Sequence, residues 1–88
     1  MSIAERATQT TWEGPLTSGE GSLSKGSSGA LDGLALTWAS RTEQPGGKTS
    51  PEELAAAAHS SCFSMALALK LGENHTPPQR LDVTATVT

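Results

Sequence analysis

The chain has 88 residues, of which 35% are hydrophobic and only 3% aromatic, and its formal net charge is −3 at pH 7. This length admits one domain at most, and so short a chain leaves much of its apolar surface exposed when it folds alone. The absence of a basic patch argues against a nucleic-acid partner, and the longest apolar run is far below the roughly 20 residues that a membrane span needs.

The N-terminal segment "MSIAERATQ" carries charges of both signs and has no apolar signal core. Together with a single cysteine, which cannot form a disulfide within the chain, this favours a cytoplasmic protein. We expect residues 1–7 to be a flexible arm. The next segment, "ATQTTWE" at 7–13, is rich in β-branched residues and predicts a first strand, which Gly14 and Pro15 end.

Two more strands are predicted before residue 42. Residues 16–24 alternate weakly and contain two glycines, which is consistent with an exposed edge strand. The run "KGSSGALDG" at 25–33 has the composition of a loop. Residues 34–41, "LALTWASR", alternate with a period of two and predict a third strand. The stretch "TEQPGGK" that follows is expected to be a flexible connection.

The clearest pattern predicts a long helix over residues 51–71. Ser50 suits the N-cap, Pro51 suits the first helical position, and Glu53 can complete a capping box with Ser50. No glycine or proline follows until Gly72, which is expected to end the helix. Small and apolar residues recur on one stripe, which is the expected buried face: Leu54, Ala58, Cys62, Met65 and Leu69.

A last strand is predicted over residues 80–88, where "RLDVTATVT" alternates apolar and polar side chains. The predicted fold class is therefore α+β, with antiparallel strands packed on a long central helix in the order β-β-β-α-β. The second half of the helix is apolar on nearly every face, so we expect other protein to surround it. No closing signal follows the last strand, which favours an N-terminal part of a longer protein.

Cys62, the only thiol, allows two interpretations. Free cysteine often packs as a small buried hydrophobe, and from spacing alone this interpretation is the stronger. A catalytic thiolate would need a nearby cation, because thiolates form at neutral pH in electropositive surroundings. The candidates are Arg41 at the end of the third predicted strand, the exposed lysines, and His59. His59 lies three residues before Cys62 and is its neighbour on the helix surface. The same histidine would equally suit packing at a helix edge.

Other chemistries have little support in the sequence. One cysteine and two histidines show no metal-ligand spacing, and the glycine pairs do not match a phosphate-binding loop. Neither a metal nor a cofactor is therefore expected. The serines around Cys62 lie on the helix body, without the strand-to-helix turn that presents a nucleophilic serine.

The stretch "TSPEELAAAAHSSCFSMALALKLGE" at 49–73 resembles the cysteine-bearing central helix of the OsmC family, which is named for osmotically inducible protein C. That family is related to the organic hydroperoxide resistance proteins. The shared pattern holds the helix cap, an acid, the cysteine and small residues in one register. The earlier stretch "TWEGPLTSGEGSLS" also resembles the opening hairpin of the family, so the resemblance covers nearly the whole chain.

The resemblance implies a thiol peroxidase of oxidative and osmotic stress defence that reduces organic hydroperoxides, and hydrogen peroxide less well. Cys62 matches the peroxidatic cysteine, which attacks the peroxide and becomes a sulfenic acid. Arg41 matches the arginine that stabilises the thiolate, and Glu52 matches the acid that orients this arginine. These roles are coherent, because a carboxylate can bind the permanently charged, planar guanidinium with two hydrogen bonds. Without the resemblance, Glu52 is an ordinary acid at a helix N-terminus.

The resemblance also implies partners. The family forms intertwined homodimers with the active sites at the subunit interface, and a dithiol reductant opens the disulfide that a second, resolving cysteine forms. This chain has no second cysteine, and the family's resolving cysteine lies beyond the strand where the chain stops. The alternative is a non-catalytic structural or interaction domain of the same fold, in which Cys62 fills the core.

Overall fold

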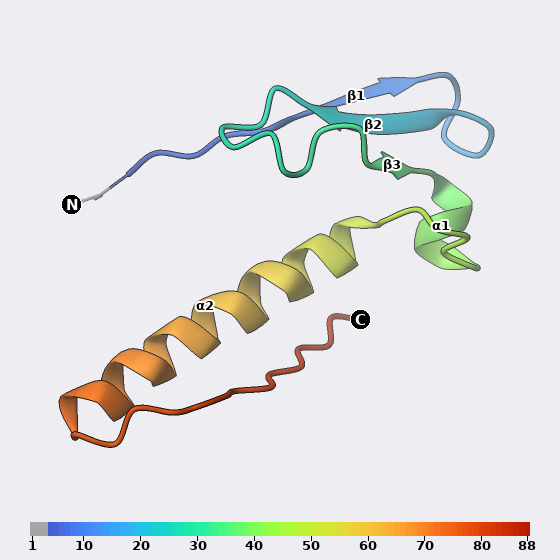
Figure 1. Cartoon of the computed structure of the whole chain (residues 1–88). Helices are drawn as coiled ribbons and strands as arrows, with labels where there is room; N and C mark the ends of the chain where they lie inside the picture. The colour runs from blue at the N-terminus through green and yellow to red at the C-terminus, as the bar shows by residue number, and fades with distance from the viewer. Residues whose placement is uncertain (1–3) are drawn as a thin grey trace. The chain divides into compact units, whose positions relative to one another are not determined.

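The computed structural model describes residues 4–88, so the first three residues of the expected N-terminal arm lie outside the described part. The elements follow in the order β1 (Gln9–Glu13), β2 (Glu20–Ser24), β3 (Ala35–Leu36), α1 (Trp38–Thr42) and α2 (Pro51–Glu73) (Figure 1). They divide into two compact units at Ser50, with the sheet and α1 in the first and α2 in the second. Antiparallel strands and a long helix confirm the α+β class.

The three strands form one antiparallel sheet in the order β1-β2-β3. β1 and β2 pair from Gln9 opposite Ser24 to Glu13 opposite Glu20. The backbone of Ala7 extends this pairing, because the Ser27 N–H donates to the Ala7 carbonyl at 2.8 Å and the Ala7 N–H donates to the Ser27 hydroxyl at 2.7 Å. The first predicted strand is therefore confirmed over residues 9–13.

The prediction that the second strand lies at an exposed edge is wrong, because β2 is the middle strand of the three. Its alternate residues Gly21 and Leu23 are buried. Leu23 is only 4% exposed and is the one buried apolar side chain among residues 4–88. The alternation looked weak in the sequence because a glycine occupies one of the two inward positions.

Gly21 is required by the side chains that meet over β2. It pairs with Trp12 on β1 and with Leu36 on β3. A Cβ atom at this position would stand 2.8 Å from Cε3 of Trp12 and 3.0 Å from Cδ1 of Leu36. The Trp12 indole N–H donates to the Gly14 carbonyl at 2.9 Å, which helps to hold the ring in place. The missing side chain thus lets two large residues from neighbouring strands approach the middle strand.

The third predicted strand is wrong beyond Leu36, because the chain turns there into the short helix α1. Thr37 is the N-cap, and it forms a capping box with Ser40. The Ser40 N–H donates to the Thr37 hydroxyl at 3.0 Å, and the Thr37 N–H donates to the Ser40 hydroxyl at 2.9 Å. These two reciprocal bonds satisfy backbone donors that an extended strand would have to pair elsewhere.

Ser40 also ties α1 to the residues that precede α2. Its hydroxyl lies 2.9 Å from the Thr49 carbonyl oxygen and donates to it, and both residues are buried. The Thr49 N–H donates to the Ala35 carbonyl at 2.9 Å, and Thr49 makes an isolated parallel bridge with Leu36. Residues 42–48 are therefore a closed connection whose two ends are held together by hydrogen bonds.

The long helix is confirmed, and it begins at Pro51 as predicted. It ends at Glu73, because His75 and not Gly72 takes the left-handed conformation, with φ 59°. The Thr76 N–H donates to the Leu71 carbonyl at 2.8 Å, and the His75 N–H donates to the Gly72 carbonyl at 3.0 Å. This hydrogen-bond pair is the Schellman motif, which satisfies the last carbonyl groups of a helix.

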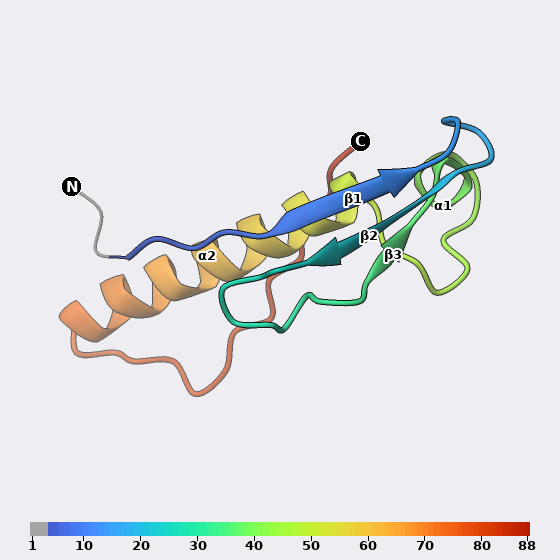
Figure 2. The ribbon, with the colours of Figure 1, turned by 90° about the horizontal axis from the view of Figure 1, so that it is seen from above.

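The predicted last strand is wrong in the described chain, since residues 80–88 form no ladder with a strand. The segment runs back along α2 toward the N-terminal end of that helix, as two perpendicular views show (Figures 1 and 2). Its alternation is nevertheless real: Leu81, Val83 and Ala85 are half-buried, and the residues between them are exposed. An alternation of apolar and polar residues shows which side chains of an extended segment face a neighbouring element. That element can be a helix as well as another strand.

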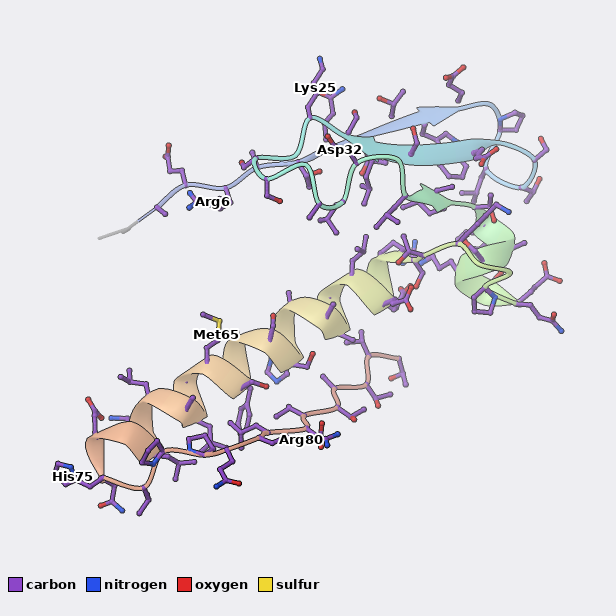
Figure 3. The ribbon with its side chains drawn as sticks, viewed as in Figure 1. Arg6, Lys25, Asp32, Met65, His75 and Arg80 are labelled. Carbon is purple, nitrogen blue, oxygen red and sulfur yellow. The ribbon has the colours of Figure 1, made fainter. Side chains whose placement is uncertain are left out.

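The predicted buried stripe of α2 is also wrong. Ala58 and Cys62 are exposed, Met65 and Leu69 keep 73% and 61% of their surfaces exposed, and only Leu54 is half-buried. At 100° per residue, this stripe lies opposite another row of positions on the helix. The opposite row is half-buried: Ala56, Ser60, Ser64, Leu67 and Leu71. Met65 points away from the C-terminal segment (Figure 3).

α2 is also long and apolar enough to pass a membrane-span test by length and composition, with a mean hydropathy of 1.3 over 18 residues. The uninterrupted apolar runs of α2 are much shorter, because His59 and three serines separate them. A core helix of a water-soluble protein passes the same test, so this observation is weak evidence for a membrane.

We predict that Gly21→Ala lowers the free energy of unfolding by about 1–3 kcal/mol, because the added methyl group overpacks the space between Trp12 and Leu36. Gly72→Ala is the matched control. Nothing lies within 4 Å of a Cβ atom at Gly72, which is inside α2, so alanine there should stabilise the helix by about 0.5–1 kcal/mol. Urea denaturation of both variants measures the difference. Equal free energies for the Gly21 variant and the unchanged protein would contradict the close packing over β2.

Candidate active site

The candidate nucleophile, Cys62, lies in the middle of α2 and is exposed. The non-catalytic interpretation requires Cys62 to fill the core. In the described chain it does not, because its side chain is exposed. Cys62 is the twelfth residue of the helix, too far from the first turn for the helix dipole to stabilise a thiolate. Small molecules can reach the sulfur, but its activation depends on other side chains.

The serine hydroxyls around Cys62 are engaged in the helix. Ser60 and Ser61 donate to the Ala57 carbonyl at 3.2 and 2.8 Å, and Ser64 donates to the Ser60 carbonyl at 2.8 Å. Such bonds to the preceding turn are usual for helical serines. Because these hydroxyls are bound to backbone oxygens, the thiol of Cys62 is the side chain best suited to act as a nucleophile in this stretch.

His59 lies one turn before Cys62 on α2, and side chains at this spacing have Cβ atoms about 5–6 Å apart. The ring also lines a groove of about 320 Å³, which Phe63 of α2 and residues 83–87 complete. The sequence did not reveal this groove. Its one signal was the alternation in residues 80–88, which we interpreted as a sheet strand and not as a segment lying on the helix.

Arg41, the candidate activating cation, is in the last turn of α1 and not at the end of a strand as predicted. Its guanidinium carbon lies 5.8 Å from the centre of the Trp38 ring, within the range of a cation–π interaction. The position of Arg41 is therefore fixed by the capping box of α1 and by the aromatic ring three residues before it. Its side chain is exposed.

Glu52 lies in the first turn of α2, with Glu53 beside it, and its side chain is half-buried. Ten residues separate Glu52 from Cys62, which amounts to about 15 Å along a helix axis. α2 by itself thus does not bring the carboxylate to the thiol. Arg41 belongs to the first unit, whereas Glu52 and Cys62 belong to the second, so a contact of Arg41 with either residue stays a prediction.

The described residues offer no alternative metal chemistry at this helix. Within residues 4–88, no three His, Cys, Asp or Glu side chains are grouped closely enough to hold a metal ion. Four charged side chains of the second unit form exposed ion pairs. Lys70 lies 3.6 Å from Glu73, and Arg80 lies 2.9 Å from Asp82.

Two curated proteins are similar to the chain: Peroxiredoxin OsmC of Escherichia coli (strain K12) and Peroxiredoxin OsmC of Shigella flexneri. Each is 46% identical to it over 79 residues, which amount to 90% of this chain and 54% of the relative. The chain thus spans about half the length of the curated relatives it matches. No family model matches the chain.

We predict that replacing Arg41 slows the alkylation of Cys62 by iodoacetamide at neutral pH. Arg41→Ala should have the larger effect, and Arg41→Lys should recover only part of the rate, because lysine keeps the charge and loses the planar fork. Arg80→Ala is the matched control, since Arg80 already pairs with Asp82 at 2.9 Å and the pair is exposed. Alkylation rates equal to that of the unchanged protein in both Arg41 variants would refute Arg41 as the activating cation.

Proposed function

The chain belongs to the OsmC family, and from this premise we propose that its protein is a thiol-dependent peroxidase that reduces organic hydroperoxides, and hydrogen peroxide less well, through Cys62. The observation that carries the proposal is an exposed thiol, the only one in the sequence, in a chain 46% identical to two peroxiredoxins. We place this activity in the cytoplasm, in defence against oxidative and osmotic stress.

The proposed reaction begins with the thiolate of Cys62. Its sulfur attacks the peroxide oxygen that carries the proton, a sulfur–oxygen bond forms and the oxygen–oxygen bond breaks. The cysteine is oxidised by two electrons to a sulfenic acid, and the peroxide is reduced to an alkoxide that takes up a proton. A dithiol reductant then returns the cysteine to the thiol. No second cysteine is present in these 88 residues, so the sulfenic acid meets a thiol from outside this sequence.

Arg41 and Glu52 have supporting roles in this proposal. Attack requires the thiolate, and a guanidinium supplies a positive charge that does not depend on pH. Glu52 would bind the guanidinium through two hydrogen bonds and fix its orientation. Because Glu52 and Cys62 are about 15 Å apart along α2, Arg41 would have to meet them from outside the helix.

We also propose that the protein works as a homodimer. Leu23 is the one buried apolar side chain among the described residues, whereas Met65 and Leu69 are largely exposed on the stripe that carries Cys62. Soluble monomers avoid contiguous apolar patches of this kind. A second copy that packs against Met65 and Leu69 would shield these side chains from water.

We predict that Cys62→Ser abolishes peroxide consumption and leaves the fold intact, because serine fits an exposed helix position but cannot be oxidised by peroxide as sulfur is. Circular dichroism and a peroxide assay measure the two properties. The control is the double variant Ser61→Cys, Cys62→Ser, which moves the thiol by one residue and 100° around the helix. Peroxide turnover that persists in Cys62→Ser would rule out Cys62 as the nucleophile. Full activity of the double variant would show that any thiol on α2 suffices.

A second prediction concerns self-association of the 88-residue chain. Sedimentation equilibrium should show a dimer, and Met65→Glu should shift it to a monomer, because this change places a charge in the middle of the apolar stripe. Ala57→Glu is the control, since Ala57 is exposed on the same helix about 80° from Met65 around the axis. A chain that sediments as a monomer and melts cooperatively at high temperature would contradict the dimer.

A further inference from the structure

We propose that His59 is a catalytic residue that protonates the alkoxide leaving group when Cys62 attacks an organic hydroperoxide. The groove between α2 and residues 83–87 would hold the organic group during this step. This inference rests on the proposed peroxidase function, and it adds a residue and a binding surface to it.

The register of α2 places the histidine beside the thiol. His59 and Cys62 are three residues apart, so their Cβ atoms are about 5–6 Å from each other on neighbouring turns. Both side chains are exposed, so both can reach a molecule that lies against this part of the helix. A hydroperoxide bridging the two residues would have one oxygen at the sulfur and the other near the imidazole.

The groove gives the organic group a place next to this pair. Phe63, the residue after Cys62, lines it together with His59, and the other wall is formed by residues 83–87, which include two valines. Its volume of about 320 Å³ lies at the small end of the range of ligand-binding pockets. A groove of this volume with apolar walls suits a compact alkyl or aryl group. Hydrogen peroxide has no such group and would gain no apolar contacts there.

Among the described residues that line the groove, His59 alone has a side chain that gains or loses a proton near neutral pH. The nearby charges on the C-terminal segment, Arg80 and Asp82, are paired with each other at 2.9 Å and lie outside the groove. Imidazole can carry and release a proton near neutral pH, which makes it the usual general acid in proteins. No other lining side chain can supply a proton to a leaving group in this way.

The proton balance of the step is simple. The thiolate attacks the terminal peroxide oxygen and gives Cys62 sulfenic acid, while the oxygen–oxygen electron pair leaves on the alkoxide. The protonated imidazole of His59 gives its proton to that oxygen, so the products are an alcohol and a neutral imidazole. Solvent then protonates the imidazole again. Proton donation by His59 accelerates the reaction most when the leaving group is an alkoxide, which is strongly basic. It accelerates the reaction least when the leaving group is stable as an anion.

The test therefore compares two oxidants in single-turnover oxidation of Cys62, followed with a sulfenic-acid trap. For cumene hydroperoxide, whose leaving group is an alkoxide, His59→Gln should lower the rate about 100-fold, as removal of a general acid typically does. For peracetic acid, whose leaving group is a carboxylate, the same variant should change the rate little. His75→Asn is the matched control, since His75 caps α2 in the left-handed conformation, which asparagine tolerates. It should leave both rates unchanged.

Alkylation by iodoacetamide separates proton donation from activation of the thiol. It requires the thiolate but no proton donor, so any loss in its rate in His59→Gln measures only how much the charge of the imidazole stabilises the thiolate. A loss with cumene hydroperoxide that is no larger than the loss with peracetic acid or in alkylation would overturn proton donation by His59. An unchanged rate with cumene hydroperoxide would overturn it as well. If neither oxidant labels Cys62 in the unchanged protein, the proposed peroxidase function itself fails.

Discussion

The first unit depends on the hydroxyl of Ser40, which is buried and shared between α1 and Thr49. Through the capping box with Thr37, it turns the chain from the last strand into a helix. Through the Thr49 carbonyl, it brings the end of the following connection back against Ala35 and Leu36. An unsatisfied buried hydroxyl or carbonyl would cost about 1–3 kcal/mol, so the hydrogen bond between these two buried residues stabilises the turn into α1. Arg41 is the next residue after Ser40, and the orientation of its helix follows from the same contacts.

The second unit is organised by the two faces of α2. One face carries Ala56, Leu67 and Leu71 and is half-buried, and the alternating residues of the C-terminal segment are half-buried as well. The opposite face carries Cys62, Met65 and Leu69 and is exposed. Covering one face leaves the thiol accessible at the boundary between an apolar stripe and a groove. A helix with a single thiol can therefore supply both an accessible nucleophile and an apolar surface for a substrate or a second subunit.

Local signals in the sequence were sufficient for the elements that depend on local chemistry. The β-branched run before Gly14 predicted β1, and Pro51 with its acidic neighbours predicted the start of α2. The sequence misled where the same pattern fits two structures. The alternation of residues 34–41 concealed a Thr-x-x-Ser cap, and the alternation of residues 80–88 reflects packing on a helix. Burial could not be predicted for the Cys62 stripe, since an apolar row shows that a face can be covered but not whether anything in the chain covers it. The groove at His59 joins residues more than 20 positions apart, and no local pattern specifies such a contact.

The position of Cys62 on α2 meets some requirements of the proposed reaction and leaves others to residues outside this helix. α2 supplies an accessible sulfur and a histidine one turn away, but the dipole of the helix is too distant to favour a thiolate. In the proposed mechanism Arg41 supplies the positive charge, and Arg41 is held on α1 by its cation–π contact with Trp38 and by the capping box. Thr49, whose carbonyl accepts the hydrogen bond from Ser40, stands two residues before Pro51, where α2 begins. The buried Ser40–Thr49 contact therefore closes the connection that begins at α1, which carries Arg41, and ends just before α2. On the proposed role of Arg41, a substitution at Ser40 should change the reactivity of Cys62 as well as the stability of the first unit.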